Sequence, residues 1–160
     1  MTRGSLDDAM EDPGERRHIK AIYLDDDAGQ AHLLARMLGK IEWLDADLHH
    51  YTRPDRALAA LLAGKADLLF LDHHLGTAES GLDVLKELRE GGYDGPIVML
   101  TNRDDESLVN SFHWHGADAY LCKSDLDASR VASTIQVALT LPHRMSPRIL
   151  KDKNRTFHGY

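Results

Sequence analysis

The chain has 160 residues, of which 42% are hydrophobic and 28% charged, and its formal net charge is −7. This size and composition indicate one globular domain with its own core and argue against a disordered chain. No apolar run approaches the roughly 20 residues needed to cross a bilayer, and the N-terminal residues lack the apolar stretch of a signal peptide. We therefore expect a cytoplasmic protein with no membrane contact, in which the single cysteine, Cys122, is a small buried hydrophobe.

Both ends of the chain differ from the middle. Residues 1–17 are polar and acidic, which predicts a flexible leader, and residues 18–141 are expected to form the domain. Residues 142–160 hold five basic residues and one acidic residue, a net charge of +4, so the remainder carries −11. This basic tail is either solvated or an arm that docks on an acidic partner or a second copy. The acidic body disfavours nucleic-acid binding.

Apolar runs and amphipathic stretches alternate along the domain. Strands are predicted over 19–24, 46–51, 68–72, 97–101 and 119–122, and a helical stripe follows the first of them around Leu34 and Leu38. Further helices are predicted over 54–63, 82–90, 105–115 and 127–141. Strict alternation indicates an α/β fold with a parallel sheet covered on both faces. The expected fold is a single doubly wound, flavodoxin-like (βα)5 domain with strand order 2-1-3-4-5.

Polar residues of a particular kind stand where these strands end. The first strand leads into Asp25-Asp26-Asp27, and the third ends in Asp72. The fourth ends in Thr101, and Lys123 follows the fifth. Because ligands collect beyond the carboxyl ends of parallel strands, we expect these side chains to converge.

The convergent groups suit phosphoryl chemistry with a divalent metal. Adjacent carboxylates repel one another, and Mg²⁺ relieves the repulsion by taking oxygen ligands. Helix capping is the alternative explanation for the aspartate triplet, and the two roles are compatible. Asp72 is the natural nucleophile for an acyl phosphate, with Lys123 and the Thr101 hydroxyl stabilising the phosphoryl oxygens.

In this arrangement the chain resembles the receiver domain of two-component response regulators. The matching segments are Ile22-Tyr23-Leu24-Asp25-Asp26-Asp27, Leu68 to Gly76, Gly81-Leu82, Val98-Met99-Leu100-Thr101 and Gly116 to Lys123. The spacings of 46, 29 and 22 residues between Asp26, Asp72, Thr101 and Lys123 are similar to those of the family. The resemblance covers about residues 18–141.

The resemblance implies a role for each matching residue. Asp72 is implied to be the phosphoacceptor, and Mg²⁺ is implied to bind Asp25, Asp26, Asp72 and the main-chain carbonyl of His74. Thr101 and Lys123 correspond to the switch hydroxyl and the phosphate-binding lysine. Tyr120 corresponds to the aromatic residue that changes rotamer as Thr101 moves towards the phosphate.

The chain departs from the family pattern at several positions. Gly76 and Ser124 stand where many receivers have proline, and Asn102 and Arg103 follow Thr101 where a small residue is common. His74 and Arg103 would border the path of the attacking water, and we expect His73, His74, Asn102 and Arg103 to tune the phosphoryl lifetime. The other histidines lack cysteine partners and zinc-motif spacing, and we interpret them as surface or loop residues.

The sequence thus predicts a stand-alone receiver that takes a phosphoryl group from a histidine kinase or histidine phosphotransfer protein. It would catalyse only its own phosphorylation and dephosphorylation, and would signal to a downstream protein partner or relay the group. A homodimer is a further expectation, and no DNA-binding domain is expected after Leu141. Two alternatives are a phosphorylation-independent binding module and a haloacid-dehalogenase-like phosphatase with Asp25 as its nucleophile. The site of phosphorylation distinguishes the phosphatase, at Asp25, from the receiver, at Asp72.

Overall fold

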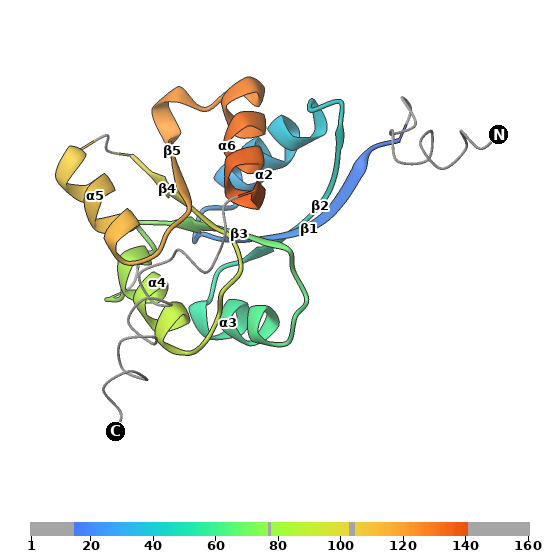
Figure 1. The fold of residues 1–160 in the computed structure, drawn as a ribbon. Helices are drawn as coiled ribbons and strands as arrows, with labels where there is room; N and C mark the ends of the chain where they lie inside the picture. Colours follow the sequence, from blue (N-terminus) through green and yellow to red (C-terminus); the bar gives the residue numbers. More distant parts are fainter. Residues whose placement is uncertain (1–14, 77, 103–104, 141–160) are drawn as a thin grey trace.

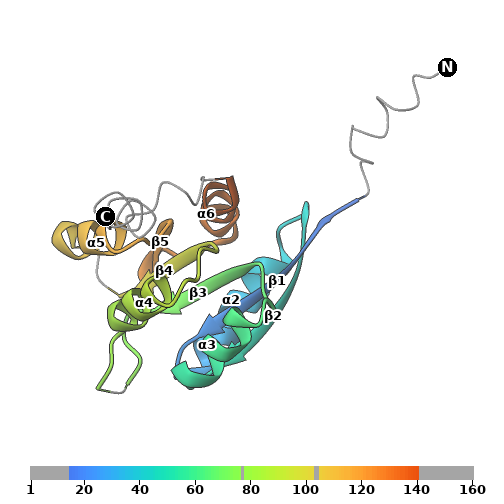
Figure 2. The same ribbon diagram turned by 60° about the horizontal axis from the view of Figure 1, so that its bottom comes forward.

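A five-stranded parallel sheet forms the centre of the molecule (Figure 1). The structure is a computed structural model that describes residues 15–76, 78–102 and 105–140. The strands are β1 (Arg17–Leu24), β2 (Leu44–Tyr51), β3 (Leu68–Asp72), β4 (Ile97–Thr101) and β5 (Ala119–Cys122). Their order, β2-β1-β3-β4-β5, can be followed in Figure 2 and confirms the predicted doubly wound fold.

Helices connect the strands in strict alternation. They are α2 (Ala28–Gly39), α3 (Pro54–Leu62), α4 (Gly81–Glu90), α5 (Glu106–Trp114) and α6 (Ala128–Thr140), with a short 3₁₀ turn, η1 (Lys123–Asp125), after β5. Local sequence explains three of the helix starts. Asp27 and Asp105 accept hydrogen bonds from the first backbone N–H groups of α2 and α5, and Ser80 begins α4 in a capping box with Asp83. Among the described residues, no helix is long and apolar enough to cross a membrane.

The helices cover the sheet in two layers, each with its own hydrophobic core. One core joins the strands to α2 and α6 through residues such as Leu34 and Ile135, and the other joins them to α3, α4 and α5 through residues such as Leu85 and Phe112. In Figure 1, α2 and α6 lie above the sheet and α3 and α4 below it. All five residues of β3 and of β4 are buried, as expected for central strands with both faces covered.

The first two strands begin earlier than predicted. β1 begins at Arg17, whose N–H donates to the Trp43 carbonyl at 2.7 Å, and β2 begins at Leu44 rather than at residue 46. The two strands pair with each other from Arg17–Leu44 onward. Arg17 and His18 are exposed polar residues, so the apolar signal of β1 begins only at Ile19, and in β2 the buried Leu44 is followed by the exposed Asp45. Most of the predicted leader, the basic tail and Leu141 lie outside the described residues.

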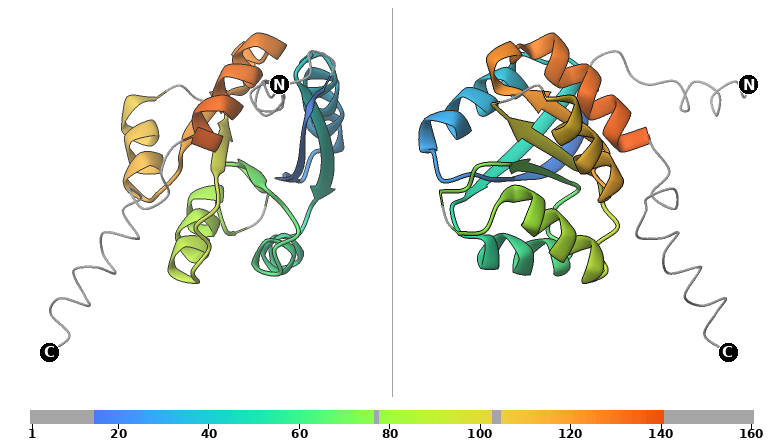
Figure 3. Two further views of the ribbon diagram at one scale, coloured as in Figure 1. Left: turned by 45° about the vertical axis from the view of Figure 1, so that its right-hand side comes forward. Right: turned by 90° about the vertical axis from the view of Figure 1, so that its left-hand side faces the viewer.

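A second correction concerns Cys122, which is half-buried because β5 is an edge strand. Figure 3 shows α5 and α6, in yellow-orange and orange-red, on either side of this strand. The Cys122 thiol is 3.2 Å from the Ser124 hydroxyl. The sequence prediction of a buried cysteine was therefore wrong.

A buried arginine ties together the loops at the other end of the sheet. The Arg89 guanidinium donates to the carbonyls of Gly116, Tyr93 and Gly95 at 2.7–3.0 Å and pairs with Asp118 at 3.2 Å. Its side chain is 4% exposed, and burial lowers the pKa of Arg89 although the Asp118 carboxylate acts against this. Asp118 also accepts from the N–H of Ile97 at 2.9 Å, so one charge pair fixes the entrances to β4 and β5.

Candidate functional site

The carboxyl ends of four strands bring the expected side chains to one place. Asp25 follows β1, Asp72 and Thr101 are the last residues of β3 and β4, and Lys123 follows β5. The two central strands run side by side in register, with Asp72 opposite Leu100. Asp25, Asp72 and Thr101 are each at most 2% exposed although all three are polar. Burial of this kind is costly unless the groups have partners, which marks the cluster as a candidate functional site.

Lys123 provides the positive charge of the site. Its ammonium Nζ lies 2.9 Å from Oδ1 of Asp72 and 3.5 Å from Oδ2 of Asp25. The side chain is only 10% exposed, so solvent screens these two ion pairs much less than surface pairs. One ammonium thus faces two carboxylates that are 47 residues apart in the sequence.

Three carboxylates in the site can offer oxygen atoms to one cation. Oxygens of Asp25, Asp26 and Asp72 all lie within 4.8 Å of one another, and Asp26 is exposed to solvent. Oδ1 of Asp72 is buried and, in the described part of the chain, accepts no hydrogen bond of good geometry despite its ion pair with Lys123. A hard divalent cation is bound by such carboxylate oxygens together with water. These residues therefore fit a magnesium ion.

The two buried carboxyl groups have pKa values that are shifted in opposite directions. Burial raises the pKa of Asp72 to about 6; the Lys123 ammonium acts against this rise and the neighbouring Asp25 carboxylate adds to it. Burial also acts to raise the pKa of Asp25, but hydrogen bonds from Tyr23, Asp72 and the Asp27 N–H hold it below its usual range. In the absence of a metal, Asp25 is thus the more acidic of the pair.

The loop from β3 to α4 passes close to the acidic residues. It is fixed at its ends, where the His73 N–H donates to the Leu100 carbonyl and the Gly81 N–H donates to the His73 carbonyl, both at 2.8 Å. Gly76 has a positive φ of 72°, and a Cβ atom there would lie 2.1 Å from Oδ2 of Asp26. A Cβ atom at Gly81 would lie 2.2 Å from the main-chain oxygen of Asp72. Gly81 thus allows a backbone approach that any side chain would prevent, and a side chain at Gly76 would force the Asp26 carboxylate to move.

Tyr23 and His50 belong to the surroundings of the site although sequence reasoning did not select them. The Tyr23 hydroxyl donates to Oδ2 of Asp25, and Nε2 of His50 lies 2.7 Å from the main-chain oxygen of Asp25. The sequence did contain a signal for Tyr23, because residues two apart in an extended segment, such as Tyr23 and Asp25, point to the same side. His50 could not be found in this way, since its contact depends on the register between β1 and β2.

The remaining predicted residues lie around the site at different depths. The half-buried His73 ring packs edge-on against Phe112 of α5, with ring centres 5.4 Å apart. His74 and Asn102 are exposed, Tyr120 is half-buried on β5, and Arg103 lies outside the described residues. The bond between Lys123 and Ser124 is a trans peptide.

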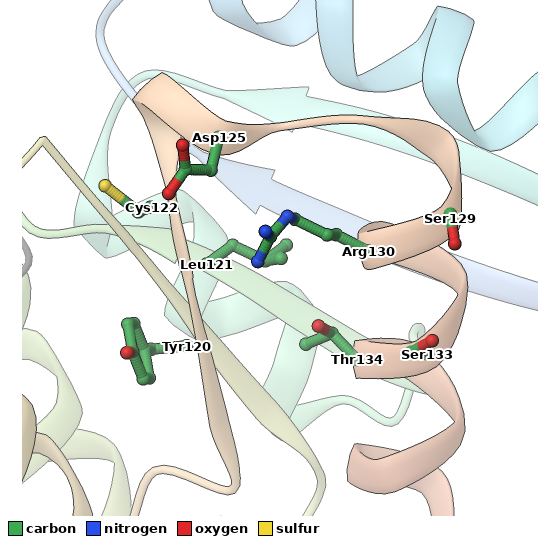
Figure 4. Close-up of a pocket in the computed structure, with 8 residues that line it drawn as sticks. All are labelled: Tyr120, Leu121, Cys122, Asp125, Ser129, Arg130, Ser133 and Thr134. Carbon is green, nitrogen blue, oxygen red and sulfur yellow. The ribbon is translucent and has the colours of Figure 1, made fainter.

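A hollow of about 420 Å³ lies beside the edge strand β5, away from the carboxylates. It lies between β5 and α6 and is lined by Tyr120, Leu121, Cys122, Asp125, Ser129, Arg130, Ser133 and Thr134. Figure 4 shows the Arg130 side chain reaching from α6 towards β5, while Tyr120 projects from the other side of the strand. The edge of the sheet therefore has a polar, partly open surface next to the predicted switch residue.

Comparison with known families identifies the class of protein. Residues 21–136 match the family model of the response regulator receiver domain. The match covers most of the chain and contains every strand end that carries a site residue. The chain belongs to the receiver domain family of two-component response regulators.

Relatives and solved structures agree with this assignment. The transcriptional regulatory protein CiaR of Streptococcus pneumoniae is 34% identical over 107 residues, which is 66% of this chain and 45% of the relative. The response regulator PmrA of Pseudomonas aeruginosa is 44% identical over 69 residues, or 42% of this chain and 31% of the relative. The chain thus spans less than half the length of these relatives.

Solved receiver domains share the fold. The receiver domain of NtrX from Brucella abortus superimposes with a TM-score of 0.67 at 25% identity, covering 76% of this chain and 99% of that domain. The chemotaxis protein CheY4 of Vibrio cholerae superimposes with a TM-score of 0.66 at 20% identity, covering 77% of this chain and all of that protein (100%). At 20% identity, the likeness to CheY4 concerns the fold alone.

Proposed function

We propose that this receiver accepts a phosphoryl group on Asp72 from a histidine kinase or a histidine phosphotransfer protein. The observation that carries the proposal is the position of the Lys123 ammonium, 2.9 Å from the Asp72 carboxylate, beside the carboxylates of Asp25 and Asp26. A nucleophilic carboxylate, a fixed positive charge and a set of metal ligands are the groups that aspartyl phosphorylation needs. Membership of the receiver family supports the same assignment.

In the proposed transfer, an oxygen of Asp72 attacks the phosphorus of a phosphohistidine donor. The new oxygen–phosphorus bond forms as the phosphorus–nitrogen bond breaks, and the imidazole leaves with the bonding electron pair. Lys123, which pairs with Asp72 before transfer, moves its charge to the phosphoryl oxygens, and Thr101 donates its hydroxyl to one of them. The burial of Asp72 and Thr101 restricts water around the product.

Magnesium would be held by Asp25, Asp26, Asp72 and the main-chain carbonyl of His74. When bound, it supplies positive charge that reduces repulsion between the incoming phosphoryl oxygens and the carboxylates. The protein's part is to hold the carboxylates ready. Asp25 is kept ionised by its hydrogen-bond donors, and Gly76 allows the β3–α4 loop to close over Asp26.

The proposed output is a change in the surface around β5. Movement of Thr101 towards a phosphoryl group leaves room that the half-buried Tyr120 then fills, which alters the surface beside the hollow between β5 and α6. The ring contact between His73 and Phe112 connects the loop after Asp72 to α5. His73, His74, Asn102 and Arg103 are proposed to set the phosphoryl lifetime.

We expect this altered surface to be read by a downstream protein partner, by a second copy of the chain, or by a phosphotransfer protein in a relay. The exposed Trp114 on α5 and Val137 on α6, which are 67% and 47% exposed, supply apolar area on the two helices that flank β5. Light scattering with and without beryllofluoride, a phosphoryl mimic, tests the homodimer. A monomer under both conditions would exclude it.

Mass spectrometry of the chain after incubation with acetyl phosphate and magnesium tests the site of phosphorylation. We expect one phosphoryl group, located on Asp72 by peptide analysis and lost when EDTA removes the metal. The Asp72→Asn variant should take no label, whereas Asp45→Asn, which changes an exposed aspartate on β2, should be labelled like the wild type.

Different outcomes identify the alternatives. A label on Asp25 would show the phosphatase chemistry instead. No label from acetyl phosphate or from a phosphorylated histidine phosphotransfer protein would leave a phosphorylation-independent binding module. A label on Asp72 that does not need a divalent cation would contradict the proposed role of Asp25 and Asp26.

A further inference from the structure

Asp25 is held from two directions by side chains and backbone of the first two strands. The hydroxyl of Tyr23 donates to Oδ2 of its carboxylate, and both residues are completely buried. The main chain is held by β2, since His50 Nε2 lies 2.7 Å from the Asp25 oxygen and the Asp25 N–H donates to the Tyr51 carbonyl at 3.1 Å. The Tyr23 contact is a hydrogen bond from a hydroxyl group, so it orients the Asp25 carboxylate rather than neutralising it.

We infer that Tyr23 is a positioning residue of the metal site, whose hydroxyl fixes the orientation of the Asp25 carboxylate for a divalent cation. This inference rests on the proposed function, because it requires that Asp25 is a metal ligand. Groups that hydrogen-bond to a ligating carboxylate fix its orientation, and their removal typically lowers metal affinity about 10- to 100-fold.

The acceptor positions of Asp25 support this role. A carboxylate has about four lone-pair sites, two on each oxygen. Oδ1 accepts from the Asp27 N–H at 3.0 Å, and Oδ2 accepts from Tyr23. Oδ1 therefore keeps one position for a cation, whose direction is set by the Asp27 N–H, and the second position on Oδ2 faces the Lys123 ammonium at 3.5 Å. Rotation of the carboxylate would break both hydrogen bonds at once.

Loss of the hydroxyl would change the balance between Tyr23 and Lys123. The Lys123 ammonium is 3.5 Å from the same Oδ2 and is the remaining donor to it. Without Tyr23, the carboxylate is free to turn towards the ammonium, which competes with a cation for the same oxygen.

A purely structural explanation makes a different prediction. The Tyr23 ring belongs to the core shared with α2 and α6, and a phenylalanine would pack there equally well. If packing were its only role, Tyr23→Phe would leave metal binding unchanged. The two explanations therefore differ only in the effect they predict for removal of the Tyr23 hydroxyl.

Isothermal titration calorimetry with magnesium chloride alone tests the inference on the wild type, Tyr23→Phe and Tyr93→Phe. Tyr93 is the matched control, because it is also a buried tyrosine and its hydroxyl has no hydrogen-bond partner among the described residues. We expect Tyr23→Phe to bind magnesium 10- to 100-fold more weakly and Tyr93→Phe to bind it like the wild type. Circular dichroism establishes that both variants are folded.

The outcomes separate this inference from the proposed function. If the wild type and Tyr93→Phe bind magnesium and Tyr23→Phe binds it as tightly or more tightly, the positioning role is wrong and the proposed function stands. If the wild type binds no magnesium, both fail. Weaker binding by Tyr23→Phe should be accompanied by phosphorylation from acetyl phosphate that reaches the wild-type rate at saturating magnesium, because the nucleophile is untouched.

Discussion

Asp72→Asn should stabilise the metal-free protein at neutral pH, although it removes the proposed nucleophile. The reason is electrostatic, since Asp72 is buried next to Asp25 and its pKa is raised to about 6 from an ordinary value of 3.8. A group with a raised pKa stabilises the fold while it holds its proton, below about pH 3.8. That stability is lost as the pH rises through about 6. At pH 7.5 the ionised carboxylate therefore destabilises the fold, and an amide of the same shape removes this cost.

The magnitude follows from the two pKa values. At about 1.4 kcal/mol per pH unit, the difference between 3.8 and about 6 corresponds to about 3 kcal/mol at pH 7.5. The ion pair with Lys123 is already included in this difference, because it acts on the pKa of Asp72. The amide buries an NH₂ group with two donors where the protonated carboxyl group has one, so we expect a net gain of about 1–2 kcal/mol in the free energy of unfolding. The same linkage predicts that the advantage falls by about 1.4 kcal/mol between pH 7.5 and pH 5, which removes most of it.

Urea denaturation in EDTA, followed by circular dichroism at pH 7.5 and pH 5, measures these differences. Asp25→Asn is the contrasting variant, because the pKa of Asp25 is lowered and its ionised form is therefore stabilising. It should reduce stability at pH 7.5. Saturating magnesium should stabilise the wild type more than Asp72→Asn, and so reduce the difference between their free energies of unfolding. An Asp72→Asn variant that is no more stable than the wild type in EDTA at pH 7.5 would refute the reasoning.

Three further substitutions test other parts of the structure. Gly76→Ala places a Cβ 2.1 Å from Oδ2 of Asp26 at a positive φ, and we expect a loss of about 1 kcal/mol or more in urea denaturation together with weaker magnesium binding in calorimetry. Arg89→Leu removes the cation that pairs with the buried Asp118 carboxylate and should cost about 3–5 kcal/mol; a loss under 1 kcal/mol would show that water replaces the guanidinium. Tyr93→Phe removes a buried hydroxyl whose pKa is raised to about 12, so stability at pH 7.5 should be unchanged or rise by up to about 1 kcal/mol. Because a raised pKa favours the fold below about pH 10 and that benefit is lost as the pH rises through about 12, the variant should also lack part of the alkaline destabilisation seen in a pH series of the wild type.

The strand order and the convergence of the strand-end side chains could be predicted because both follow from local patterns and one topological rule. Short apolar runs separated by amphipathic stretches indicate parallel strands, and crossovers of one hand leave few orders for them. Residues at the strand ends, such as Asp72 and Lys123, are then brought close together regardless of how the core side chains pack. The prediction needed no knowledge of any single contact, which explains why it succeeded for residues 98 positions apart, Asp25 and Lys123.

What the sequence did not reveal depends on register and on burial in three dimensions. His50 reaches Asp25 only because β1 and β2 pair in a particular register, and a shift of one residue would turn it to the other face. Arg89 stands near the end of an amphipathic helix, where an arginine is usually solvated, and its burial results from loops that arrive from Gly95 and Gly116. The exposed start of β1 carries too few apolar residues to be recognised alone.

Lys123 links the stability of the site to its proposed chemistry. With all groups ionised, the three carboxylates of Asp25, Asp26 and Asp72 and the one ammonium of Lys123 have a net charge of −2. A bound divalent cation would bring the sum to zero and would release the ammonium from Asp25 and Asp72. The lysine is then available to the oxygens of an incoming phosphoryl group. In the metal-free site Lys123 pairs with Asp25 and Asp72, whereas the proposed transfer needs its ammonium at the phosphoryl oxygens. Metal binding and phosphoryl transfer should therefore be energetically coupled through the position of Lys123.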